Sequence, residues 1–183
     1  MFAENVRAEV LPKSGTIKLD PTIVQKIAQR VPVFAGMTPQ CLLATLATAE
    51  NYPVGAGEAV FREGDIGSAF YVVISGEVKV QKHKDGETVE LARLGTGQCF
   101  GEMALVQNDV RTATVVAIGD SVTMRFERER IDAIPESAHV IYRNIARILA
   151  SRLDESSVML AELVVQKKQS GLMPLDSSGN IEI

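Results

Sequence analysis

Glycine recurs at short, regular intervals through the middle of the chain. Between Tyr52 and about Arg125, short apolar or alternating runs are separated by turns that contain glycine. These glycines are residues 55, 57, 64, 67, 76, 86, 95, 97 and 101. Glycine adopts backbone conformations that are costly for other residues, so it is expected at sharp corners. Short strands joined by such regular turns are typical of a β-sandwich or barrel.

Helical patterns flank this region on both sides. Ile23, Ile27 and Val31 have helical spacing, and Thr38 followed by Pro39 is a typical helix start. A short helix is expected after Glu127, and a longer one from Pro135 to about Lys168. We therefore predict an α+β fold in one domain over residues 21–168, with helices in 21–50, a β-sandwich or barrel over 52–126 and C-terminal helices in 127–168. Residues 1–20 are predicted to be a flexible arm and 169–183 a flexible tail.

Composition excludes several classes of function. The chain has 23 acidic and 19 basic residues, a net charge of −4, which argues against a large electrostatic nucleic-acid surface. No apolar run approaches the ~20 residues needed to cross a bilayer, and the N-terminus lacks the pattern of a secretory signal. Cys41 and Cys99 show no metal-binding spacing and are expected to be buried free thiols. We expect a cytoplasmic protein without nucleic-acid or membrane partners.

The stretch "FGEMALVQNDVRTAT", Phe100 to Thr114, brings an acid and a base into apolar surroundings. Gly101 lets the backbone approach a ligand closely, and "EMAL" can form one helical turn whose amides face an anion. Arg111 offers a planar guanidinium suited to phosphate oxygens, while Glu102 can accept hydrogen bonds from a sugar hydroxyl. The alternative is a buried salt bridge between Glu102 and Arg111, but it leaves the glycine and the small residues unexplained. The pattern favours a nucleotide cradle.

This stretch closely resembles the phosphate-binding cassette of cyclic nucleotide-binding domains, and "VFREGDIGSAFYVVISGEVKV" resembles their glycine-punctuated strands. The resemblance covers roughly Val33 to Leu163 and implies a β-roll (double-stranded β-helix, or jelly roll) with a short phosphate-binding helix. It implies that Gly101 and Glu102 hold the ribose 2′-hydroxyl and that Arg111 neutralises the cyclic phosphate. The remaining implied ligand-binding residues are Met103, Ala104, Thr112 and Ala113 in the cassette, Val80 and Leu91 beside the base, and Ser156 and Ser157 at the adenine edge.

The resemblance also implies the ligand and the partners. The ligand is a cyclic purine nucleotide, and no cofactor is expected. Thr112 resembles cGMP-preferring members, but bacterial cAMP binders also carry a hydroxyl there, and we favour cAMP. Val80 and Leu91 could equally be ordinary core residues. A heptad-like seam along the last helix predicts a homodimer, and its residues are Ala146, Leu149, Leu153, Ser156, Leu160 and Leu163. An effector protein is expected to receive the signal.

Two other classes remain as alternatives. A cupin-type enzyme would share the β-roll, but His83 and His139 fall in different elements, so no metal site and no enzyme activity are expected. A degenerate β-roll could serve as an interaction module that binds no nucleotide. Only twenty residues follow Leu163, too few for a helix-turn-helix reader of DNA. We expect a sensor without an output domain, or the sensor part of a longer transcription regulator, channel or enzyme.

Overall fold

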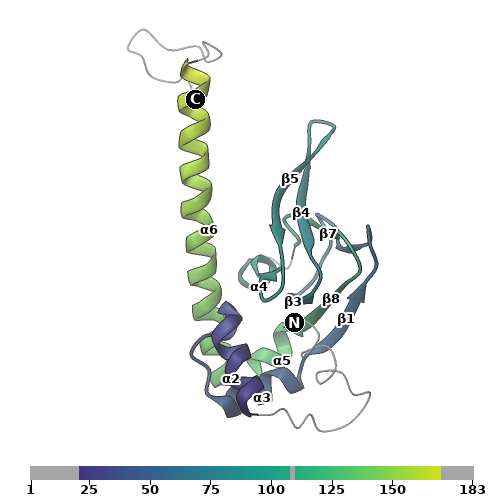
Figure 1. Cartoon of the computed structure of the whole chain (residues 1–183), viewed down its shortest axis with the longest axis vertical. Coiled ribbons are helices and arrows are strands. Elements are labelled where there is room, and N and C mark those ends of the chain that lie inside the picture. Colours follow the sequence, from purple (N-terminus) through teal and green to yellow (C-terminus); the bar gives the residue numbers. More distant parts are fainter. Residues whose placement is uncertain (1–20, 108–109, 170–183) are drawn as a thin grey trace. The chain divides into compact units, whose positions relative to one another are not determined.

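The computed structural model describes residues 21–107 and 110–169. Within these residues, eight strands form two four-stranded antiparallel sheets, with helices before and after them (Figure 1). One sheet has the order β1-β8-β3-β6, and its strands are Glu50–Val54, Ser121–Glu127, Ala69–Ser75 and Cys99–Phe100. The other has the order β2-β7-β4-β5, and its strands are Ala59–Phe61, Thr114–Ala117, Val78–Lys84 and Glu87–Leu94. The predicted α+β β-roll is confirmed.

Helices precede and follow the strands. The helices are α2 (Pro21–Arg30), η1 (Pro32–Phe34), α3 (Pro39–Ala47), α4 (Met103–Val106), α5 (Arg128–Asp132) and α6 (Pro135–Gln169). Of these, η1 lies in a stretch where the sequence pattern indicated no helix. The predicted start of α3 is confirmed, because the Thr38 side chain accepts a hydrogen bond from the amide of Cys41 at 3.2 Å and Pro39 is the first helical residue. The predicted flexible arm at 1–20 and the predicted flexible tail at 169–183 lie outside the described residues, except for Gln169, which is the last residue of α6.

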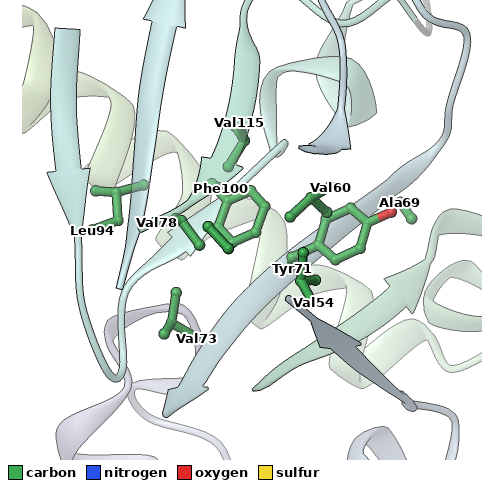
Figure 2. Packing of buried hydrophobic residues seen from close by; sticks show 10 residues of the cluster. Val54, Val60, Ala69, Tyr71, Val73, Val78, Leu94, Phe100 and Val115 are labelled. Carbon is green, nitrogen blue, oxygen red and sulfur yellow. The ribbon is translucent and has the colours of Figure 1, made fainter. Parts of the chain in front are cut away.

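The core between the two sheets fixes where the cassette begins. Its buried residues come from both sheets, and Figure 2 shows the rings of Tyr71 and Phe100 side by side among the valines. These two rings are stacked with centroids 5.2 Å apart. Because Phe100 ends β6 inside this core, the chain must leave the sheet at Gly101, and α4 follows at once. The packing therefore anchors the start of the Phe100–Thr114 stretch.

The β4–β5 hairpin contains a bulge that the sequence pattern did not reveal. Val80 pairs with Ala92, whereas the next residue, Gln81, pairs with Glu90, so Leu91 is an extra residue on β5. A bulge of this kind disrupts the ladder locally and redirects the side chains beyond it. The bulge therefore changes the direction of the β5 backbone at Leu91.

Buried polar contacts hold the first turns of α6 to the N-terminal helices. The Asn144 side chain donates to the carbonyls of Val33 and Ala35, at 3.1 and 2.8 Å. The hydroxyl of Ser137 accepts a hydrogen bond from Thr45 of α3 at 2.8 Å. These bonds join α3, η1 and the start of α6 in one packed unit.

Two compact units divide the chain, one ending at Ile145 and the other beginning at Ala146. The described part of the second unit is the last part of α6, from Ala146 to Gln169. Many of its large apolar side chains are exposed, among them Leu153 at 67%, Leu160 at 63% and Leu163 at 50%. Among residues 21–107 and 110–169, no helix is both long and apolar enough to cross a membrane.

Candidate functional site

The cassette is built on the exit of β6 from the core. Gly101 has φ 77°, a left-handed conformation that suits glycine. Glu102 follows as the N-cap residue of α4, and only 2% of its surface is exposed. Ala104, inside α4, is also buried. The predicted turn of helix after the glycine is therefore present, with the carboxylate of Glu102 enclosed by protein.

Arg111 lies against the same glycine from the other side of the cassette. Its Nη1 donates a hydrogen bond of 2.9 Å to the carbonyl of Gly101. Its guanidinium carbon lies 4.2 Å from the centre of the Phe61 ring and 5.8 Å from that of Tyr71, so both rings offer a negative face to the cation. Only 4% of Arg111 is exposed. Gly101 and Arg111, ten residues apart in the sequence, are thus brought together.

Two hydrogen bonds also fix the backbone of Arg111. Its amide donates to the carbonyl of Asp65 at 2.8 Å, and its carbonyl accepts from the amide of Gly64 at 2.9 Å. The turn before β3 therefore holds the arginine in register. Neither this contact nor the aromatic contact with Phe61 was expected from the sequence.

Gly67 provides space for the guanidinium. A Cβ atom on Gly67 would lie 2.9 Å from Nη2 of Arg111, and one on Gly101 would lie 2.9 Å from its Nη1. Gly67 has no left-handed φ, so its expected role as a corner residue is replaced by a role in close packing. The glycine-punctuated pattern marked this position but not its reason.

Burial has opposite effects on the two ionisable groups in contact here. It lowers the pKa of the Arg111 guanidinium, because removal from water disfavours the charged form. It raises the pKa of the Tyr71 phenol for the same reason, since the charged form of tyrosine is the deprotonated one. The site therefore holds a cation beside a neutral phenol, and a bound anion would relieve part of the cost of burying that cation.

Thr112 and Ala113 follow Arg111 along the edge of the site, and both are half-buried. The Thr112 hydroxyl lies 3.5 Å from the sulfur of Met103 and donates to it. This contact brings the two ends of the cassette together, because Met103 begins α4. Sulfur is a weak acceptor, so a stronger one could recruit the hydroxyl.

The two residues expected beside the base differ in their surroundings. Val80 is half-buried and packs against the core between the sheets. Leu91 is 56% exposed at the bulge of β5. Leu91 is thus not a core residue of the described structure, and its contact with a base stays a prediction.

Ser156 and Ser157 lie in the second unit, on α6. Their hydroxyls donate to the carbonyls of Arg152 and Leu153 in the same helix, each at 2.8 Å. Such bonds satisfy a serine inside a helix without any ligand. Their role at an adenine edge stays a prediction. In the part of the chain that the structure describes, no three metal-binding side chains gather in one place.

Comparison with known families identifies the domain. Residues 53–137 match the profile of a family described as "Cyclic nucleotide-binding domain". These residues belong to that family. The matched range contains both sheets except the first residues of β1, and the whole cassette.

Individual relatives of this cyclic nucleotide-binding domain include regulatory proteins. The chain is 34% identical to the cyclic AMP receptor protein of Thermus thermophilus over 130 residues, which are 70% of this chain and 60% of the relative. The crystal structure of the catabolite activator protein of the same organism superposes with a TM-score of 0.66 at 34% identity, over 73% of this chain and 63% of that one.

A third similarity is to a kinase regulator. The structure of the regulatory domain of Toxoplasma gondii PKA with cAMP superposes with a TM-score of 0.57 at 28% identity, over 64% of this chain and 46% of that one. The chain thus spans about half to two thirds of the length of these relatives.

Proposed function

We propose that the chain is a regulatory module that binds a 3′,5′-cyclic purine nucleotide and carries out no catalysis. The observation that carries this proposal is the position of Arg111, a buried cation fixed by Gly101, Phe61 and the backbone of the preceding turn. A buried charge is costly unless it is paired. A cyclic phosphate bound at its outer edge would supply that pairing, and the guanidinium can offer it two parallel donors.

In this proposal, different residues of the cassette bind the ribose and the phosphate. Glu102, enclosed beside Gly101, accepts a hydrogen bond from the ribose 2′-hydroxyl. The amides of Ala104 and Ala113 and the hydroxyl of Thr112 support Arg111 at the phosphate. In this scheme the Thr112 hydroxyl leaves the sulfur of Met103, which is the weaker acceptor, for a phosphate oxygen. Small side chains at Ala104 and Ala113 keep their amides accessible to the ligand.

The favoured ligand is cAMP, with cGMP as the alternative. Val80 packs at the edge of the core and offers an apolar surface to a purine. The name of the Thermus relative and the cAMP in the Toxoplasma structure support the same nucleotide. Thr112 could also donate to a guanine group, which is why both nucleotides belong in the test.

The signal leaves through α6. Its exposed leucines support a dimer contact with a second copy of the same helix, and Ser156 and Ser157 would then meet the purine at that contact. An effector protein, located with the module in the cytoplasm, would receive the change. Because the chain spans about 60% of the Thermus relative, the module is also a candidate sensor part of a longer regulator, channel or enzyme.

Calorimetric titration with cAMP, cGMP and 5′-AMP tests the proposal. We expect saturable binding of at least one cyclic nucleotide with a 1:1 ratio, and tighter binding of cAMP than of cGMP. Binding of 5′-AMP should be much weaker, because its open phosphate carries more charge and a different shape. A folded protein that binds neither cyclic nucleotide would favour the degenerate interaction module instead.

A further inference from the structure

Arg128 connects the cassette to the helices that follow the β-roll. It is the first residue of α5, directly after β8. Its backbone amide donates to the carbonyl of Ser68 at 3.0 Å, which fixes its position at the start of β3. Its Nη2 atom donates to the carbonyl of Ala104 in α4. One side chain therefore bridges the cassette helix and α5.

The acceptor of this bond lies in a helix that needs outside support. α4 contains only four residues, Met103–Val106, and a helix this short has little stability of its own. Carbonyls in the last turn of a helix have no partner within it, and a cation there also complements the helix dipole. The bond from Arg128 to Ala104 meets both needs. Arg128 thus contributes to where α4 lies.

From α5 the connection continues into the first turns of α6. Ile131 of α5 is almost completely buried. The amide of Ala138 donates to the carbonyl of Ile134 at 2.9 Å across the junction between the helices. The Tyr142 hydroxyl donates to the Asp132 carboxylate at 2.9 Å, which ties α6 back to α5. These contacts join α5 and residues up to Ile145 within the first unit.

We propose that Arg128 is a positioning residue that couples α4 to α5 and to the first turns of α6. This inference rests on the proposed function, in which a cyclic nucleotide occupies the cassette beside α4. A ligand that fixes α4 then favours one position of the Arg128 side chain, and through it one position of α5. By linkage, the position of α5 affects nucleotide affinity to the same extent. In this proposal Arg128 acts through its bond to the Ala104 carbonyl.

The first measurement uses the ligand-free protein. Hydrogen exchange is compared among wild type, Arg128→Met, Arg128→Lys and the control Arg130→Met. The methionine keeps the aliphatic stem but has no donor. Arg130 lies two residues further along α5, and its guanidinium contacts the carbonyl of Thr48 and the carboxylate of Glu50 instead of the cassette.

We expect exchange at the amides of Leu105 in α4 and of its C-cap residue Gln107 to accelerate about tenfold in Arg128→Met, with partial recovery in Arg128→Lys. Exchange in β3 and in Arg130→Met should stay at the wild-type level. Unchanged α4 exchange in Arg128→Met would overturn the proposal, as would equal acceleration in β3, because the effect would then be general destabilisation.

The second measurement repeats the exchange with saturating cAMP. In wild type, the nucleotide should slow exchange in α4 and also change it over residues 131–145. In Arg128→Met, the effect on α4 should persist while the effect on 131–145 is largely lost, and cAMP affinity should fall about tenfold. If cAMP changes exchange over residues 131–145 in Arg128→Met as much as in wild type, the proposed coupling is wrong. If wild type binds no cyclic nucleotide, the proposed function fails, and the ligand-free measurement still decides whether Arg128 holds α4.

Discussion

Arg111 can occupy its position between the Phe61 ring and the Gly101 carbonyl because two neighbouring residues have no side chain. At the residue scale, the buried charge of Arg111 therefore depends on the space that the two glycines leave. The guanidinium fits only where Gly67 and Gly101 leave room for it. Because it is buried, an anion bound beside it would offset more of the cost of its charge than at an exposed site. Substitutions that leave the charge intact should still weaken binding if they remove this space.

Gly67→Ala is the direct test of that space. The new methyl group would lie 2.9 Å from Nη2 of Arg111, so the guanidinium must move away from its present position. Overpacking of this kind costs about 1–3 kcal/mol, and we expect cAMP affinity to fall roughly tenfold by calorimetry.

Gly95→Ala is the matched control, because nothing lies within 4 Å of a Cβ atom there and its φ is not left-handed. It should bind cAMP as wild type does. Equal affinity of Gly67→Ala and Gly95→Ala would show that the guanidinium does not need this space.

Glu102→Gln tests the ribose contact. The carboxylate is a stronger acceptor than the amide, so the substitution should weaken cAMP binding by about 1–2 kcal/mol, or about tenfold. The 2′-deoxy analogue lacks the hydroxyl, and its affinity should change little. Equal losses for both ligands in parallel titrations would place Glu102 in another role, such as an ion pair with Arg111.

At the scale of elements, the start of α6 is held to η1 by one buried amide. Asn144 is almost fully buried and donates to the carbonyls of Val33 and Ala35. Asn144→Ala would leave both carbonyls without this donor, at a cost of about 1–3 kcal/mol. We expect the midpoint of urea unfolding to fall with an unchanged slope.

Asn51→Ala is the control for this prediction. Asn51 is exposed in β1, and replacing it should change the free energy of unfolding by no more than about 0.5 kcal/mol. If the two alanine variants unfold at the same urea concentration, the amide of Asn144 does not hold α6 to η1.

The sequence predicted the elements better than their contacts. Regular turns, helical spacing and the Thr38 cap have local causes, so the β-roll, α3 and the start of α4 could be placed from sequence alone. The bulge at Leu91 could not, since it depends on how β4 and β5 pair. The contacts of Phe61 with Arg111 and of Arg128 with Ala104 join residues far apart in the chain, and no local pattern reveals them.

At the scale of the whole molecule, the exposed face of α6 predicts a dimer. Leu153 and Leu160 are seven residues apart and lie on one face of the helix, and more than half of each is exposed. The variant Leu153→Glu with Leu160→Glu should sediment as a monomer and bind cAMP more weakly, since the proposed dimer contact and the proposed purine contact share this helix.

Val158→Glu is the control for the dimer, because Val158 is equally exposed but lies on another face of α6. It should sediment as wild type does. A wild-type protein that is monomeric in sedimentation velocity with and without cAMP would contradict the dimer.

The central claim is that Arg111 binds the phosphate of a cyclic nucleotide. The most direct measurement is calorimetric titration of cAMP into wild type, Arg111→Ala and the control Arg62→Ala, an exposed arginine in the turn before β3. Loss of one partner of a buried charged pair costs ~2–5 kcal/mol, so Arg111→Ala should bind cAMP roughly 30-fold or more weakly, while Arg62→Ala binds as wild type. Near-wild-type affinity in a folded Arg111→Ala protein would contradict the claim.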